Sequence, residues 1–175
     1  MSFAIESGLS PAQIAALEEQ IQHILPAGYT RFLSQYNGFY VAAPFYCNVP
    51  FDRVDNGDID LTCFFGYEVS NKNHDLLAIN DEFLDEINHV QNALLIGADA
   101  GDNFYVLICN EYTPYVYYWD RTHLHAYDDK LNYDIAEQDE CGHLYLVATD
   151  FTTFFNQVIE RLNEQKGRPT DDRNT

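Results

Sequence analysis

Basic residues are scarce in this sequence. The 175-residue chain has nine lysines and arginines against 28 aspartates and glutamates, which gives a formal net charge of −19. Proteins that bind a nucleic-acid backbone neutralise its phosphates with basic side chains, and anionic membrane surfaces attract the same residues. The charge therefore argues against nucleic acid and membrane as partners. It favours a basic protein, because opposite charges attract over long range; the alternative is that the acidic residues only keep the chain soluble.

Long apolar runs are also missing. A membrane-spanning helix needs about 20 apolar residues, whereas one of the longest runs here covers only Phe104 to Cys109. The stretch from Met1 to Glu6 has no basic region and no apolar segment before a cleavage site, so it is not typical of a signal peptide. We therefore expect a cytoplasmic protein.

The four cysteines form no recognisable framework. Cys47, Cys63, Cys109 and Cys141 contain no CxxC pair, which is the spacing of many zinc sites. A disulfide framework is unusual in a chain of this length without a secretion signal. We expect reduced thiols, and no metal or cofactor.

Apolar and aromatic residues, in contrast, are abundant. They make up 46% and 15% of the chain, which is ample material for the core of one domain. The sequence has no internal repeat and no linker-like stretch. We expect a single domain over residues 1–165, followed by a polar tail over residues 166–175.

Four segments have apolar residues at helical spacing. They are residues 10–25, 26–36, 76–87 and 150–162. The first begins with a capping box formed by Ser10 and Gln13, with Pro11 in the first turn. The second is expected to end at Asn37-Gly38, a typical left-handed stop.

Strand-favouring runs dominate the middle of the chain. The expected strands are residues 61–69, 93–96, 103–109, 115–119 and 143–148. Gly97 to Asp102 is typical of a hairpin connection between two of them. The stretch from Phe39 to Asp60 contains two prolines and indicates an edge strand or loop with an acidic turn.

Motifs of nucleophilic catalysis are not present. The chain has no Gly-x-Ser-x-Gly elbow. Cys141 and His143 lie two residues apart in the sequence. On a strand their side chains would stand about 6.6 Å apart, too far for a nucleophile and its base. Asp99 and Asp102 lack the alternating ligands of a calcium loop and fit a hairpin turn.

Two histidines leave a metal site open as an alternative. His123 and His125 would share one face of a strand, where they could hold a metal together with Asp120 or a distant third ligand. This spacing is weak evidence, because paired surface histidines are common. A metal-dependent hydrolase is therefore kept as an alternative function.

The densest charge feature is an acidic segment near the C-terminal end of the expected sheet. Its six carboxylates belong to Asp128, Asp129, Asp134, Glu137, Asp139 and Glu140. A solvated loop is one interpretation, and a docking surface for a cationic partner is the other. In the second, Tyr127 and Tyr133 are candidate aromatic anchors. A second candidate group consists of Asp52, Asp55, Asp58 and Asp60.

The order of several short motifs resembles the SMI1/KNR4 (SUKH) superfamily. The stretches that carry the resemblance are Leu25-Pro26 through Tyr29 and Phe32-Leu33 to Asn37-Gly38, then Leu95 to Ile108, Val116 to Asp120 and Thr149 to Phe155. They look like the family's LPxxYxxFLxxxNGG pattern, its acidic glycine hairpin, its VYxWD strand and its closing SFxxFL helix. Phe39 departs from the pattern, which usually has a second glycine there.

The resemblance implies an α+β fold, a single domain with helices packed against a mostly antiparallel curved sheet. Bacterial members are mostly immunity proteins that bind and neutralise a cognate toxin, often a nuclease, in contact-dependent or polymorphic toxin systems. Fungal members are intracellular regulatory proteins. The motif residues are turn glycines and core aromatics, so no catalytic residue can be carried over.

The leading hypothesis is therefore a bacterial immunity protein for a basic, nuclease-type toxin domain, without enzymatic activity. A non-catalytic regulatory scaffold of the same fold is the alternative.

Overall fold

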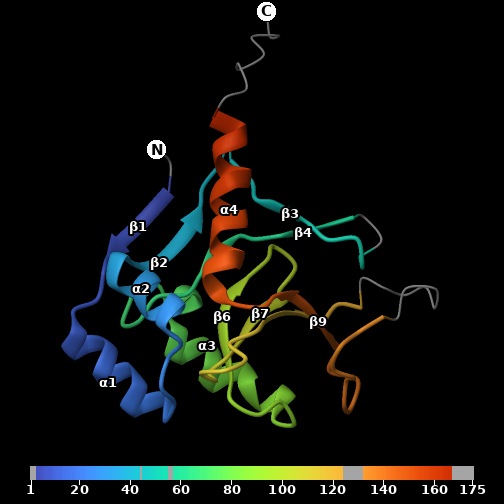
Figure 1. The fold of residues 1–175 in the computed structure, drawn as a ribbon, viewed down its shortest axis with the longest axis horizontal. Coiled ribbons are helices and arrows are strands. Elements are labelled where there is room, and N and C mark those ends of the chain that lie inside the picture. Colours follow the sequence, from blue (N-terminus) through green and yellow to red (C-terminus); the bar gives the residue numbers. More distant parts are fainter. Residues whose placement is uncertain (1–2, 44, 55–56, 124–131, 167–175) are drawn as a thin grey trace, which may run out of the picture.

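Seven strands form one antiparallel sheet, which organises the rest of the chain (Figure 1). The computed structural model describes residues 3–43, 45–54, 57–123 and 132–166. The spatial order of the sheet is β1 (Phe3–Ser7), β2 (Tyr36–Val41), β5 (Cys63–Phe64), β6 (Ala93–Ala98), β7 (Phe104–Ile108), β8 (Val116–Asp120) and β9 (His143–Ala148). A separate two-stranded ribbon pairs β3 (Asn48–Pro50) with β4 (Asp58–Asp60).

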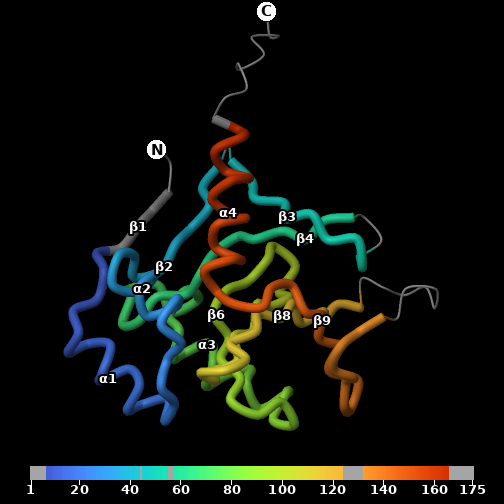
Figure 2. Tube along the Cα trace, in the orientation of Figure 1, coloured from blue at the N-terminus to red at the C-terminus, as the bar shows by residue number. Residues whose placement is uncertain are grey.

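In the described part of the chain, four α-helices pack around this sheet. They are α1 (Pro11–Ile21), α2 (Ala27–Gln35), α3 (Leu76–Phe83) and α4 (Phe151–Lys166), with two short 3₁₀ turns, η1 (Lys72–His74) and η2 (Leu84–Ile87). The chain can be followed along the tube in Figure 2, with α4 upright in the upper middle of the view and α1 at its lower left. The predicted α+β fold, with helices on an antiparallel sheet in a single domain, is confirmed.

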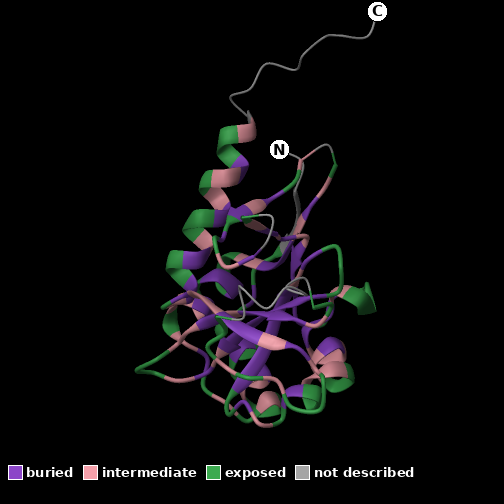
Figure 3. Cartoon of the chain, turned by 90° about the vertical axis from the view of Figure 1, so that its right-hand side faces the viewer, coloured by how far each residue is buried: buried purple, intermediate pink, exposed green. Residues whose placement is uncertain are grey.

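Alternation along the central strands buries both faces of the sheet. Successive strand residues point to opposite faces. In β5 the ring of Phe64 packs against Phe151 of α4, whereas the next residue, Phe65, packs against Phe104. Phe104 in turn contacts Phe83 at the end of α3. Helices α2 and α4 therefore cover one face, and α3 covers the other. Figure 3 shows the buried strands between these layers and the exposed outer side of α4.

The expected capping box of the first helix is confirmed. Ser10 and Gln13 exchange hydrogen bonds at the start of α1, with Pro11 at its first position. The four predicted helices are present, although the third continues from α3 into η2.

The expected helix stop at Asn37-Gly38 is wrong. Helix α2 ends at Gln35, and both residues belong to β2. The buried amide of Asn37 accepts a hydrogen bond from the backbone N–H of Tyr67 (2.7 Å) and donates one to its carbonyl (2.8 Å). Gly38 has a φ of +86°, and a Cβ there would lie 3.1 Å from the backbone of Gly66. The motif thus joins two chain segments instead of ending a helix.

The expected strand over residues 61–69 is also too long. Only Cys63–Phe64 pairs in the sheet, because the chain turns at Gly66. There Gly66 donates a hydrogen bond to the carbonyl of His74 and accepts one from the N–H of Leu76. Strand β1 was not predicted, and the region predicted as an edge strand or loop with an acidic turn contains the end of β2 and the β3–β4 ribbon.

The predicted hairpin between β6 and β7 is confirmed, and Asp99 organises it. Its buried carboxylate accepts hydrogen bonds from the N–H of Gly101 (2.7 Å), the N–H and side-chain amide of Asn103 (both 2.9 Å) and the hydroxyl of Tyr118 (2.7 Å). Burial and the neighbouring Asp99 raise the pKa of Tyr118, which keeps its hydroxyl protonated as a donor. The acidic glycine motif therefore has a structural role, because the carboxylate of Asp99 closes the β6–β7 hairpin.

We predict that Asp99→Asn lowers the free energy of unfolding by about 2 kcal/mol, because an amide donor then faces groups that themselves donate. Urea unfolding followed by fluorescence measures the change. The same substitution at exposed Asp81 is the control, for which we expect a change within about 0.5 kcal/mol. Equal effects at the two positions would contradict a special role of Asp99.

Candidate functional site

The described part of the predicted acidic segment, residues 132–140, runs along the outer edge of β9. The N–H groups of Asp134 and Ile135 donate to the carbonyl of Leu144 (3.0 and 3.1 Å), and Leu144 donates back to Ile135 (3.0 Å). An exposed sheet edge invites pairing with other chains, and this contact covers part of it. The segment is therefore held on the sheet, which distinguishes it from a freely solvated loop.

Asp134 connects the two predicted acidic groups. Its carboxylate accepts hydrogen bonds from Arg53 Nη1 and from the N–H of Leu146, both at 2.6 Å. Arg53 lies between β3 and β4, and its guanidinium also sits over the rings of Phe51 and Tyr145, 6.0 and 5.3 Å from their centroids. The structure thus brings the β3–β4 ribbon and the acidic segment together, with part of the charge of Asp134 balanced.

Glu137 lies at the centre of a small histidine cluster. Its carboxylate contacts His123 Nε2 at 3.1 Å and accepts a hydrogen bond from the N–H of Gly142 at 2.9 Å, while His143 Nε2 lies at 3.7 Å. Burial raises the pKa of Glu137, but the bonds from His123 and Gly142 and the charge of His143 outweigh it, so the pKa is lowered. Tyr133 stacks on His143 with ring centroids 4.0 Å apart.

Asp139 and Glu140 remain exposed at the end of the segment. Both have positive φ angles, +53° and +61°. With Asp85 and Glu86 of η2 they line a shallow depression of about 340 Å³, which we call the acidic hollow. Arg121 forms an ion pair with Glu86 (2.9 Å), which fixes η2 beside the end of β8.

Asp85 and Glu86 fall in the helix predicted over residues 76–87 and are not among the predicted site residues. They lie far from the acidic segment in the sequence, so only the tertiary fold brings them to Asp139 and Glu140. The alternation of charged and apolar residues marks them as exposed, but it does not indicate their partners.

The members of the second predicted group have different surroundings. Asp52 is exposed, whereas Asp58 accepts a hydrogen bond from Asn48 (2.8 Å) across the ribbon. Asp60 accepts bonds from Thr62 (3.3 Å) and the N–H of Ala100 (3.2 Å), and burial raises its pKa. The remaining candidates, Asp55, Tyr127, Asp128 and Asp129, lie outside the described residues, as do His125 and residues 167–175 of the predicted tail.

Within the described residues, no three histidine, cysteine, aspartate or glutamate side chains are grouped so that they could hold a metal ion. The ring of His123 contacts the carboxylate of Glu137. All four cysteines are free thiols, and burial raises the pKa of Cys47, Cys63 and Cys109 to about 12. Buried thiols of this kind are poor nucleophiles. No helix in the described ranges is long and apolar enough to span a membrane.

Comparison with protein-family models places this chain in a known family. The model described as SMI1 / KNR4 family (SUKH-1) matches residues 8–157, which is well over half of the chain. The matched stretch begins just before α1 and ends within α4. A search of curated proteins found no match.

We predict that the Glu137 cluster makes the protein sensitive to acid. Because the folded pKa of Glu137 is lowered from its usual 4.5, its contribution to stability is present above about pH 4.5 and is lost as the pH falls through the folded pKa. Thermal unfolding as a function of pH measures this. In Glu137→Gln the midpoint is lower at neutral pH, by about 2–4 °C per kcal/mol lost, and falls less steeply in acid.

Exposed Glu19 on α1 offers the matched control, since Glu19→Gln changes the net charge equally without touching the cluster. If both variants show the same pH dependence, the cluster does not stabilise the segment.

Proposed function

Because the chain belongs to the SMI1/KNR4 family (SUKH-1), we propose that it is an immunity protein, a non-catalytic inhibitor that binds and neutralises a cognate toxin domain. The proposed toxin is basic and of the nuclease type. The proposed setting is the cytoplasm of a bacterium that uses a contact-dependent toxin system.

The observation that carries the proposal is the acidic hollow on a chain of net charge −19. A nuclease presents lysine and arginine to the phosphates of its substrate. Exposed carboxylates can occupy the same surface, and charge complementarity then raises the association rate and rejects acidic partners. The inhibitor needs no reactive group for this, because it competes with the substrate for the same cations.

Within the proposed site the carboxylates have two roles. Asp139 and Glu140 are exposed and meet the toxin directly, together with Asp85. Asp134 and Glu137 are engaged by Arg53 and by the histidines, so they position the segment. Tyr133, with 39% of its surface exposed, is the described aromatic candidate for an anchor.

The direct test is neutralisation. Toxin domains encoded next to this chain are expressed in a bacterial host with and without it, and growth is measured. We expect one such domain to be toxic alone and harmless with the immunity protein, and to form a single tight complex with it. Several weak partners and no rescue of growth would favour a regulatory scaffold.

We predict that the double variant Asp139→Asn/Glu140→Gln associates more slowly with that toxin domain. Asparagine tolerates the left-handed backbone at position 139, so the change removes charge with little strain. The association rate constant at low salt falls about tenfold, and the difference shrinks as the salt concentration rises. Stopped-flow fluorescence measures both.

The matched control is Glu19→Gln/Glu160→Gln, which removes two exposed charges from α1 and α4. We expect its rate constant to stay within about twofold of the parent. Equal slowing of the two double variants would mean that only net charge matters, and no slowing in either would place the interface elsewhere.

A further inference from the structure

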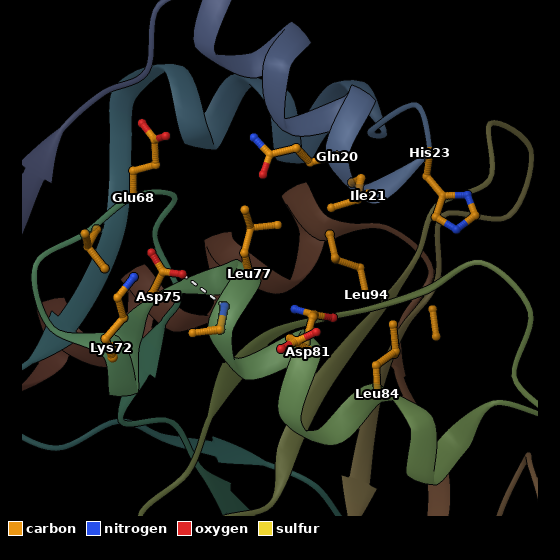
Figure 4. A pocket seen from close by; sticks show the side chains of 14 residues that line it. Gln20, Ile21, His23, Glu68, Lys72, Asp75, Leu77, Asp81, Leu84 and Leu94 are labelled. Carbon is orange, nitrogen blue, oxygen red and sulfur yellow. Dashed lines mark hydrogen bonds between the residues drawn. The ribbon is translucent and has the colours of Figure 1, made fainter.

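A second hollowed surface lies at the C-terminal end of α1. One hollow, of about 800 Å³, lies between α1 and α3 (Figure 4). The other, of about 1140 Å³, lies between α2 and the chain around Cys109 and Pro114. His23 lines both hollows, so the turn after α1 forms the ridge between them. We call the two hollows and this ridge the α1 surface.

Two large apolar side chains stand out of this surface. Ile24, on the ridge, has 77% of its surface exposed, and Tyr112, in the turn between β7 and β8, has 86% exposed. Ile24 lines the larger hollow directly, and Tyr112 follows Glu111, which also lines it. A single exposed apolar residue is ordinary. Here Ile24 and the turn that carries Tyr112 border the same hollow, and exposed apolar surface rimmed by polar residues is a feature of protein-binding sites.

Both side chains are presented on ordered turns. The carboxylate of Glu18 accepts a hydrogen bond from the N–H of Leu25 (2.8 Å), which ties down the ridge. The side-chain oxygen of Asn110 accepts bonds from the N–H groups of Tyr112 (2.9 Å) and Thr113 (3.3 Å). Residues that are ordered before binding lose less entropy when a partner arrives, so this turn geometry favours their use as anchors.

The lining of the hollows indicates the chemistry of the partner. In Figure 4 the smaller hollow has an apolar centre that includes Leu77 and Leu94. Exposed charged side chains stand around it, namely Glu68 and Asp81 with Lys72, whereas Asp75 is buried and caps α3. The larger hollow has Glu111 and Asp150 with Arg31. Acidic groups thus outnumber basic ones in both, and a second copy of a chain with charge −19 would be repelled.

The α1 surface is continuous with the acidic hollow through one helical stretch. Asp81 and Leu84 line the smaller hollow on one side, and Asp85 and Glu86 line the acidic hollow on the other. A partner seated on the acidic hollow can therefore extend across α3 and η2 onto the α1 surface.

We propose that the α1 surface binds a basic segment of the partner polypeptide that carries apolar side chains, with Ile24 and Tyr112 as its anchors. The inference rests on the proposed function and adds a division of roles to it. The acidic hollow accelerates encounter, and the α1 surface provides the apolar burial that slows dissociation.

Three synthetic helical peptides test this with the full-length protein. The first peptide is an amphipathic helix with leucine on one face and lysine on the other. The second has glutamine in place of each leucine, and the third has glutamate in place of each lysine. Fluorescence anisotropy gives each affinity, and ¹⁵N NMR shift changes locate the contact. We expect the leucine–lysine peptide to bind and to shift the amides around Ile24 and Tyr112. The other two peptides bind at least about tenfold more weakly.

The variant Ile24→Ser/Tyr112→Ser tests the anchors. It weakens binding of the leucine–lysine peptide at least about tenfold, while its melting temperature stays unchanged because both side chains are exposed. The control is Tyr46→Ser, since Tyr46 is 53% exposed and its backbone is bonded to Gln165 of α4. We expect the control to keep the parent affinity.

The outcomes separate the inference from the proposed function. If the leucine–lysine peptide binds, but only Asp139→Asn/Glu140→Gln weakens it, the α1 surface is not an anchor and the acidic site stands. If the glutamine–lysine peptide binds as tightly as the leucine–lysine peptide, the α1 surface is likewise not an anchor and the acidic site stands. Tight binding of the leucine–glutamate peptide contradicts the charge argument for the α1 surface. If neither lysine peptide binds, recognition of cationic chains fails altogether.

Discussion

The constraint on which the rest of the structure depends is that both faces of the central sheet are apolar. Adjacent residues of β7 and β8 send aromatic rings to opposite sides, as Phe64 at the end of β5 and the following Phe65 do. Neither face can therefore be left to solvent. Burying each large ring contributes roughly 1.5–3 kcal/mol relative to exposure. Helices α2 and α4 on one side and α3 on the other meet this need. Polar and charged groups are left to the sheet edges, the loops and the outer helix faces.

This arrangement explains why the acidic residues form surfaces instead of being spread evenly. The edge of β9 is partly covered by residues 134 and 135 through backbone bonds, and Arg53 and the histidines hold the neighbouring carboxylates. Like charges on one segment repel each other, and the ion pair with Arg53 and the hydrogen bond between His123 and Glu137 reduce that cost. Charge that is not balanced in this way, at Asp139 and Glu140, faces solvent beside η2 and is free to meet a partner.

Much of the fold was predictable because its signals are local. Helical spacing, the capping box at Ser10 and the strand-favouring runs after Ala93 depend on neighbouring residues, and the structure confirms them. The helix stop predicted at Asn37-Gly38 was wrong because the same dipeptide can either end a helix or form hydrogen bonds with a distant loop. Here the bonds from Asn37 to Tyr67 decide, and no local pattern contains them.

The candidate sites were less predictable for the same reason. The composition indicated a surface for a basic polypeptide. The proximity of Asp85 to Asp139 and the two hollows beside Ile24, however, depend on contacts between segments that are distant in the sequence. The central claim is that a basic polypeptide is held by these two surfaces together. Hydrogen–deuterium exchange of the complex with the cognate toxin domain tests it most directly. The account predicts slower exchange in residues 22–25, 84–89, 110–114 and 132–142, whereas protection confined to β1 or the outer side of α4 would contradict it.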